Sequence, residues 1–419
     1  MRKMTLNFDG KNIILERRFY SMIKNRRLCF AILVMILLLF IGCQNNNSHF
    51  EDPDLNRVIE EKLEKSGSEI TSDDLNNIVE LEVAKENIEN LEGIEKLKNL
   101  QKLNLAINEI EDLTPLRPLN NLKSLNLRSN NISSVQSLEE LDNLEKLNLF
   151  QNEIDDISPL VSLHNLKILN LSANNIDDIS IINELGNLEE LNLAFNQVRD
   201  VEPLTGLEEV KKLNINRNSR IENVEKIGEL KSLKELIISG TPANNLYFLK
   251  DLDKLEILYL PTGALEDFEA LENLTNLKEL NVSGFMNNQL DLAPLRNMTK
   301  MERLYIDDRK ITDLKPLENM SELEFLYAKN NKIQDLEPLS NLDSLINLYL
   351  ANNDIEDISP LAELESLYTL SIHDNNIKDI SPLLEIELLL KVYIDKDIIE
   401  EQENVAKQLR ENNVAVEGK

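Results

Sequence analysis

The chain has 419 residues and a formal net charge of −30, because 75 Asp and Glu outnumber 45 Lys and Arg. Residues 43–419 alone hold 73 acidic and 37 basic side chains, a net charge of −36. So acidic a chain argues against nucleic acid and anionic lipid headgroups as partners, and it favours solubility or a cationic partner. The length suggests two or three ordinary domains, but a repeat array can run that long as one unit.

Residues 1–42 have the pattern of a signal peptide. Basic side chains come directly before an apolar run, at Lys24, Arg26 and Arg27. The run, Leu28–Ile41, is shorter than the roughly 20 residues that a membrane-spanning helix needs. A signal peptide starting at Met22 would have a more typical length, so we expect translation from Met22, with Met1 as the alternative.

The apolar run ends in Phe40-Ile41-Gly42-Cys43, which resembles the lipobox of bacterial lipoproteins, with Phe40 where Leu is usual. The resemblance implies that Cys43 is diacylated and becomes the mature N-terminus. The alternative is an uncleaved anchor with an incidental cysteine. Cys29 would leave with the signal peptide, so a disulfide within the mature chain is excluded. Residues 43–49 are then the lipidated cysteine and a polar tether.

Residues 50–80 predict a helical N-terminal cap. Four apolar residues share one helix face: Leu55, Val58, Ile59 and Leu63. Thr71, with Asp74 three residues later, is similar to the capping box of a second short helix. Such a segment would close the end of the array that follows, which otherwise exposes leucines and a strand edge.

Residues 81–399 repeat a unit of 22 residues, of which Leu147–Ile168 is one copy. Its Leu-x-Leu segment predicts a short strand with both leucines pointing inward. Asn152 follows where the chain turns, and an Asn side chain satisfies backbone groups there. Asp156–Leu160 predicts entry into a helical turn, with Pro at a position that needs no N–H. Leucines spaced by three then return the chain in tight turns, and stacked coils share their leucines.

The array contains about 14 coils between Leu81 and Lys391. Residues 400–419 predict a C-terminal cap, with a closing helix over Glu400–Glu411 and a short strand over Val414–Val416. The repeat loosens after Leu236. Four other residue types take the Asn position there: Thr241, Gly263, Phe285 and Arg309.

The L-x-x-L-x-L-x-x-N-x-I-x-D-I-x-P-L repeat resembles the leucine-rich repeat of bacterial internalin-type proteins, and Phe50–Leu100 is similar to the cap before such arrays. The resemblance implies an α/β solenoid. This is a right-handed superhelix with a parallel concave β-sheet, short 3-10 or helical turns on the convex side, and a helical N-terminal cap. It also implies protein recognition on the bacterial surface. A departure is that no Leu-Pro-x-Thr-Gly sorting motif or wall-binding module is visible, which weakens the expectation of host-cell adhesion.

The concave position between the two strand leucines changes along the array. It is Asn in six successive coils: Asn104, Asn126, Asn148, Asn170, Asn192 and Asn214. Later coils place tyrosines there: Tyr259, Tyr305, Tyr327, Tyr349 and Tyr393. Arg303, Phe325 and Lys329 belong to the same face. Adjacent strands lie roughly 4.8 Å apart, and Tyr and Arg often dominate binding energy, so these eight residues are the candidate partner-binding patch. The alternative is that rings and amides are ordinary fillers stacked between coils.

Catalysis and metal binding find little support. The motifs of serine hydrolases, zinc proteases, dithiol enzymes and phosphate-binding loops are absent. An Asp recurs once per coil, for example at Asp156 and Asp178, but single aspartates lack the dense oxygen ligands of a calcium loop. Capping of the convex turns explains them better. We expect no cofactor and no catalytic residue.

Two functions remain open besides a weakly supported enzyme or metal-dependent binder. The first is a non-enzymatic, lipid-anchored protein outside the cytoplasm of a bacterium, on its membrane or cell surface. It would bind another protein, of a host or of its own cell, through the concave face. The second is a structural or scaffolding envelope lipoprotein. In both, a monomer is expected, and the lipid is the only contact with the membrane.

Overall fold

The computed structural model describes residues 5–8, 11–14, 49–243, 245–263, 266–284 and 289–419. The lipobox and Cys43 lie outside these residues. The chain divides into two compact units, Met1–Ile70 and Thr71–Lys419. In the described ranges, no helix is long and apolar enough to cross a membrane.

The first unit contains the first helix predicted from the sequence. Its elements are an antiparallel pair, β1 (Thr5–Phe8) and β2 (Lys11–Ile14), then helix α2 (Pro53–Leu63) and a 3-10 turn, Gly67–Glu69. Helix α2 begins after Asp52, whose side chain accepts hydrogen bonds from the backbone N–H groups of Asp54 and Leu55. Pro53 occupies the first turn, where its missing N–H costs nothing. Leu55 and Ile59 are buried.

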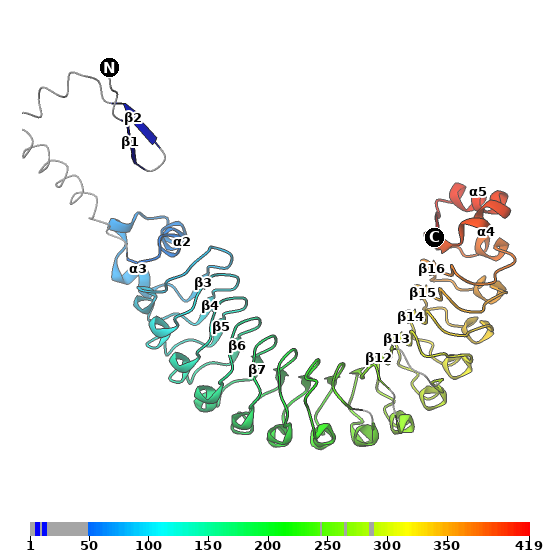
Figure 1. The fold of residues 1–419 in the computed structure, drawn as a ribbon, viewed down its shortest axis with the longest axis horizontal. Coiled ribbons are helices and arrows are strands. Elements are labelled where there is room, and N and C mark those ends of the chain that lie inside the picture. The colour runs from blue at the N-terminus through cyan, green and yellow to red at the C-terminus, as the bar shows by residue number, and fades with distance from the viewer. Residues whose placement is uncertain (1–4, 9–10, 15–48, 244, 264–265, 285–288) are drawn as a thin grey trace, which may run out of the picture. The chain divides into compact units, whose positions relative to one another are not determined.

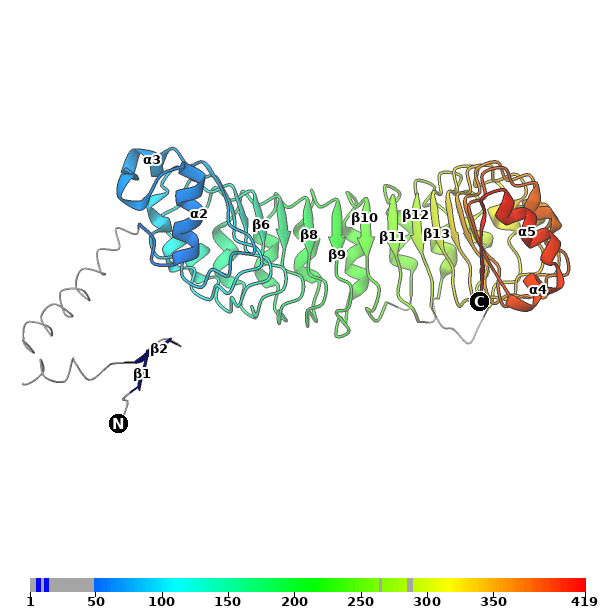
Figure 2. The same ribbon diagram turned by 90° about the horizontal axis from the view of Figure 1, so that it is seen from above.

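The second unit is a single parallel sheet of 16 strands with its helical turns on the opposite side (Figure 1). The strands follow one another in chain order, as Figure 2 shows from above. They are β3 (Glu80–Glu82), β4 (Lys102–Asn104), β5 (Ser124–Asn126), β6 (Lys146–Asn148), β7 (Ile168–Asn170), β8 (Glu190–Asn192), β9 (Lys212–Asn214), β10 (Glu235–Ile237), β11 (Ile257–Tyr259), β12 (Glu279–Asn281), β13 (Arg303–Tyr305), β14 (Phe325–Tyr327), β15 (Asn347–Tyr349), β16 (Thr369–Ser371), β17 (Lys391–Ile394) and β18 (Ala415–Gly418). The predicted leucine-rich solenoid is therefore confirmed.

Each coil from β3 to β16 returns along the convex side through a 3-10 turn. These turns are Ile94–Lys96, Thr114–Leu116, Gln136–Leu138, Ser158–Ser162, Ser180–Glu184, Glu202–Gly206, Val224–Glu229, Tyr247–Asp251, Phe268–Leu271, Ala293–Leu295, Lys315–Leu317, Glu337–Leu339, Ser359–Leu361 and Ser381–Leu384. The recurring Asp opens them: Asp156 Oδ1 accepts from the backbone N–H of Ser158 at 2.8 Å. That hydrogen bond lowers the pKa of Asp156. The aspartates thus cap turns, and in the described residues no group of three or more potential metal ligands is found.

The core is a stack of leucines closed by an asparagine ladder. Leu169 and Leu171 of β7 are buried with their counterparts in every regular coil. Asn174 Oδ1 accepts from the N–H of Ile154 in the preceding coil at 3.0 Å. Its amide donates to the carbonyl oxygens of Leu149 and Leu171, both at 3.0 Å. Each Asn therefore joins two coils through backbone groups that would otherwise be buried without a partner.

Arg309 replaces this ladder where the repeat is irregular. Its side chain is fully buried, with 0% exposed surface. The guanidinium donates to the backbone oxygens of Val282, Gly263 (3.1 Å), Pro261 (3.3 Å) and Ser283 (3.4 Å). One long arginine thus serves carbonyl oxygens of two preceding coils, whereas a ladder Asn such as Asn331 reaches only one preceding coil. Burial lowers the pKa of Arg309 to about 10, so the side chain remains charged at neutral pH.

The ends of the second unit are helical. Helix α3 (Ser72–Asn76) begins with the predicted capping box, in which Thr71 and Asp74 bond each other's backbone N–H. The predicted single closing helix over Glu400–Glu411 is wrong: two helices, α4 (Lys396–Glu401) and α5 (Glu403–Glu411), meet at Gln402. Gln402 leaves the helix because its side chain accepts from the N–H of Ile380 and donates to Lys378 O.

Candidate partner-binding surface

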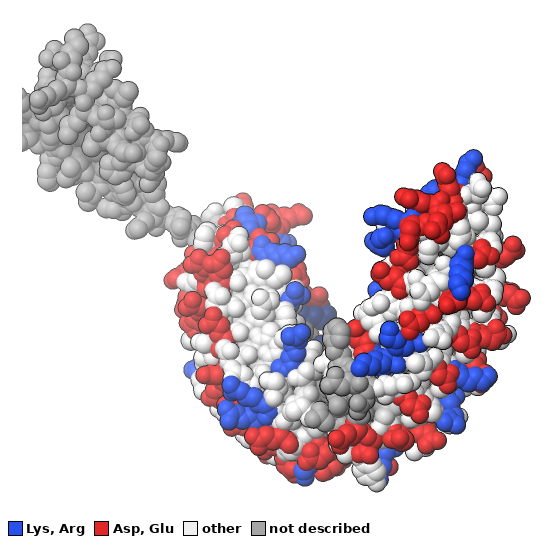
Figure 3. All heavy atoms as spheres, turned by 45° about the vertical axis from the view of Figure 1, so that its right-hand side comes forward, with Lys and Arg blue, Asp and Glu red and all other residues white. Residues whose placement is uncertain are grey.

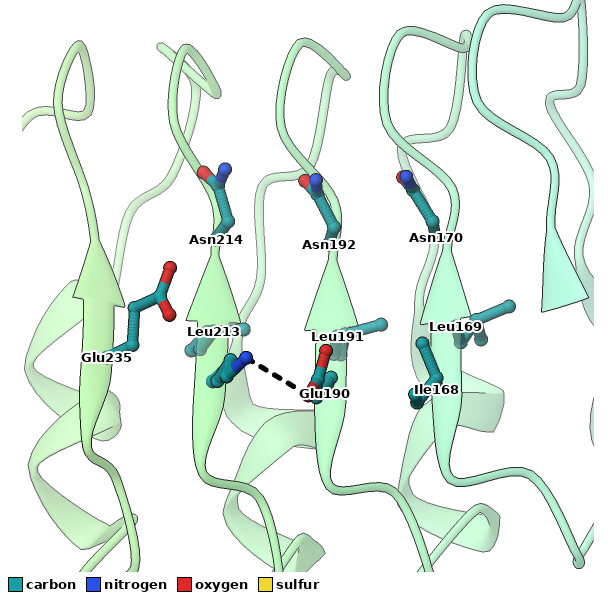
Figure 4. A pocket seen from close by; sticks show the side chains of 10 residues that line it. Ile168, Leu169, Asn170, Glu190, Leu191, Asn192, Leu213, Asn214 and Glu235 are labelled. Atoms are coloured by element: carbon teal, nitrogen blue, oxygen red, sulfur yellow. Dashed lines mark ion pairs between the residues drawn. The ribbon is translucent and has the colours of Figure 1, made fainter. Parts of the chain in front are cut away.

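The asparagine half of the concave face is polar and internally bonded. Figure 4 shows Asn170, Asn192 and Asn214 side by side on three neighbouring strands, over a hollow of about 250 Å³. Each amide oxygen accepts from the N–H two residues later, as Asn192 does from Ala194 at 3.0 Å. Beside the amides, Lys212 pairs with Glu190 at 3.1 Å. The three amides in Figure 4 close local turns, whereas Asn104 of the same row donates to Glu82 of the preceding coil at 2.6 Å.

The tyrosine half forms a continuous row of rings, here called the tyrosine stripe: Tyr259, Tyr305, Tyr327 and Tyr349. The rings of Tyr305 and Tyr327 stack with centroids 4.7 Å apart and planes 13° apart. Those of Tyr327 and Tyr349 stack at 4.6 Å and 14°. Tyr259 reaches over the smaller Asn281 on the intervening strand β12 and meets Tyr305 at 6.2 Å in a tilted contact. The rings therefore form the contiguous row that the spacing of the strands predicts.

Cations border the tyrosine stripe. The Arg303 guanidinium lies 5.1 Å from the ring centroid of Phe325, and Lys329 Nζ lies 4.8 Å from that of Tyr349. Arg303 also pairs with Glu279 at 3.7 Å, and the Tyr259 hydroxyl donates to the same carboxylate. Such cation–π contacts hold long side chains in place, so less side-chain freedom is lost when a partner binds.

The stacking decides which parts of the rings a partner can touch. Faces within the row are covered by neighbouring rings, and the side chains are half-buried, so the ring edges are what the stacking leaves for a partner to contact. A sugar or a base stacks on an open ring face, which the inner rings do not offer. An apolar edge beside a hydroxyl suits a protein surface, which contributes both apolar side chains and backbone acceptors.

Two predicted site residues stand apart from the stripe. Tyr393 on β17 is separated from Tyr349 by the buried Ser371 of β16, and its ring instead faces Lys391 and Lys419, each 4.8 Å from the centroid. Cys43 lies outside the described residues, so its lipidation stays a prediction.

Sequence reasoning missed the carboxylates at this surface. Glu279 bridges Tyr259 and Arg303, although it is one of many acidic residues at strand starts and has no distinguishing signal in the sequence. Asp307 accepts from the Lys329 N–H at 2.6 Å, and burial raises its pKa. It occupies the position two residues after Tyr305, where neighbouring coils have other residue types.

Tyrosines of the stripe should ionise at a higher pH than an unfolded tyrosine does. Burial raises the pKa of Tyr259, Tyr305 and Tyr327, and for Tyr259 the Glu279 carboxylate raises it further. An unfolded tyrosine ionises near pH 10. The stripe's contribution to stability is thus complete below pH 10 and is lost as the pH rises through the higher folded values.

We expect absorbance at 295 nm to show at least three of the eight tyrosines ionising above the normal range in folded protein, and all eight normally in denaturant. Glu279→Gln should lower the pKa of Tyr259 and leave Tyr327 unchanged. One common transition near pH 10 in the folded protein would contradict the buried stripe.

Comparison with known proteins agrees with this architecture. The leucine-rich repeat family described as "Leucine Rich repeats (2 copies)" matches residues 120–162, 142–184, 164–206, 186–232 and 343–385. An internalin, InlF, from Listeria monocytogenes is 31% identical, with a TM-score of 0.66 over 83% of this chain and 96% of that one. The leucine-rich repeat protein LIC12759 of Leptospira interrogans is 23% identical, with a TM-score of 0.64 over 79% and 81% of the two chains. No match was found among curated protein sequences.

The chain therefore belongs to the leucine-rich repeat proteins. Its likeness to the Listeria internalin places it near the bacterial internalins. A receptor kinase ectodomain from Arabidopsis thaliana, solved in complex with Casparian strip integrity factor 2, shares the fold at 19% identity and a TM-score of 0.55, over 73% of this chain and 46% of that one.

Proposed function

We propose that this protein is a non-enzymatic, monomeric recognition module that binds another protein through the C-terminal half of its concave face. The tyrosine stripe carries the proposal: four rings held in register by β11, β13, β14 and β15, with Arg303 and Lys329 beside them. Preorganised aromatic side chains lose little entropy on binding and are the residues most often dominant at interfaces.

The stripe is preferred over the asparagine hollow for a physical reason. In the hollow, each amide oxygen already accepts from a backbone N–H and Lys212 already pairs with Glu190, so a partner gains little by displacing water there. The stripe offers apolar ring edges whose burial is favourable. Similar proteins support a binding role: the Arabidopsis receptor of the same fold was solved with its factor bound.

The test is capture of a partner by the full-length protein from bacterial envelope extracts and from host-cell extracts. A protein retained by the wild type and by an Asn148→Ser, Asn170→Ser, Asn192→Ser control, and lost with the stripe variant described in the Discussion, supports recognition through the stripe. Equal retention by all three proteins would place the binding surface elsewhere. No partner from either extract would favour a scaffolding role in the envelope.

We also propose that the protein is held outside the cytoplasm by lipid on Cys43, because Phe40-Ile41-Gly42-Cys43 follows an apolar run. Mass spectrometry of the mature N-terminal peptide should find it beginning at diacylglyceryl Cys43. Cys43→Ala should leave the signal peptide attached, because the cysteine is the modified residue. A wild-type N-terminus at Met1 or Met22, without lipid, would contradict the anchor.

A further inference from the structure

We propose that a second site, separate from the tyrosine stripe, binds a phosphate group. It is a hollow of about 380 Å³ at the entry to strands β10–β13, here called the lysine hollow. Its lining is Lys234, Lys254, Glu256, Asn276, Lys278 and Lys300. Four ammonium groups thus surround one carboxylate on a chain whose net charge is −30. Figure 3 shows acidic side chains spread over the face that it draws, with basic ones gathered in patches.

The residues just before the strands normally neutralise one another. Along this row Lys167 pairs with Glu145 at 3.2 Å, and Lys211 pairs with Glu189 at 2.6 Å. In the lysine hollow, two lysines instead share one carboxylate. The Glu256 carboxylate forms ion pairs with Lys234 at 2.9 Å and with Lys278 at 3.3 Å. Of the three residues of this row that line the hollow, two are lysines and one is a glutamate, an excess of one positive charge; the next residue of the row, Glu302, does not line it.

A second row supplies two more charges. Two residues earlier, six coils have an Asn whose amide donates to a backbone oxygen of the preceding coil. Examples are Asn121 to Lys98, Asn143 to Asn120, Asn165 to Asp142 and Asn276 to Asp253, at 2.8 to 2.9 Å.

Lys254 and Lys300 hold this position on either side of Asn276, whereas Ser232 and Glu322 hold it in the next coils outward. Lys300 Nζ donates to Asn276 Oδ1 at 2.8 Å. In the part of the chain that the structure describes, neither lysine forms an ion pair. Both lysines therefore add a positive charge to the same hollow.

The charges favour a compact phosphate group over a long polyanion. A lysine ammonium offers three donors as a point charge, which suits phosphate oxygens approaching from several directions. The acidic remainder of the chain repels an extended polyanion such as nucleic acid. At physiological salt that repulsion fades beyond about 8 Å, so a small anion inside the hollow experiences chiefly its four lysines and the single carboxylate of Glu256.

The test is calorimetric titration of the full-length protein with two probes of the same chemistry. Inorganic pyrophosphate represents a free ligand, and a short poly(glycerol phosphate) represents phosphate carried on a polymer. Binding of either probe that is weakened by added salt supports the site. The probe that binds more tightly shows whether the phosphate comes from a free ligand or from a polymer. Failure of both probes to bind the wild type overturns it.

The variant Lys254→Asn, Lys300→Asn makes the test specific. It gives both coils the Asn that the coil between them has at Asn276, so the fold should be retained while two of the four ammonium groups are lost. The dissociation constant for the bound probe should rise at least about tenfold, because the loss of even one charge-assisted hydrogen bond has that effect. Lys102→Asn, an exposed lysine outside the hollow, is the control and should leave affinity unchanged. Equal affinity of the double variant and the wild type would also overturn the proposal.

Discussion

Replacing Arg309 with Met should lower the free energy of unfolding by about 3–5 kcal/mol, since several buried backbone acceptors lose their donor. The guanidinium donates to four carbonyl oxygens and is fully buried, so water cannot take its place without opening the coils. Met fills similar volume, which separates the loss of hydrogen bonds from the loss of packing. Chemical denaturation followed by circular dichroism measures the change.

Arg309→Asn is the informative control. In regular coils the ladder Asn donates to its own coil and to the preceding one, as Asn331 does to Ala328 and Ile306. An Asn at 309 could serve Val282 in the same way but not Pro261 or Gly263. We expect it to lose about half as much stability as Arg309→Met. Equal stability of the Met variant and the wild type would show that the guanidinium does not hold these coils together.

Replacing Tyr305, Tyr327 and Tyr349 with Ser should weaken partner binding at least about 100-fold, because buried aromatic anchors at interfaces commonly contribute 2 kcal/mol or more each. The inward leucines of β13–β15 are untouched, so strand content should persist. Two stacked ring pairs are lost as well, which should reduce stability by about 1–3 kcal/mol. Binding is measured by titration calorimetry with the captured partner.

A matched variant separates the role of the rings from that of the hydroxyls. The triple Tyr→Phe protein keeps the stacked row and its apolar edges. If ring edges dominate recognition, it should retain most of the affinity. Circular dichroism of both variants confirms that strands remain. An unchanged affinity of the Ser variant would remove the stripe from the binding surface.

The fold could be predicted because every coil repeats the same local signals. Leu147 pairs with Leu169 in register, and the same holds across the irregular coil, where Leu280 pairs with Leu304 despite two inserted residues. The inward leucines set that register, since a slip of one residue would turn them to solvent. Capping of the convex turns by Asp followed from the same repetition.

What the sequence did not predict depends on contacts between coils. The Asn position identifies Arg309 as irregular, but not that its side chain reaches backward to Gly263 and Pro261. Helix propensity does not foresee the break at Gln402, which tertiary hydrogen bonds impose. Likewise, strand spacing alone does not place Tyr259 against Tyr305, because that contact requires the small Asn281 between them.

The most direct measurement is hydroxyl-radical footprinting of the protein with and without its captured partner. Oxidation of Tyr305, Tyr327 and Tyr349 should fall strongly in the complex, whereas Phe195, exposed outside the stripe, should react as in the free protein. That result would locate the partner on the C-terminal concave face without any mutation. Unchanged oxidation of the three tyrosines, with protection elsewhere, would contradict the proposed recognition surface.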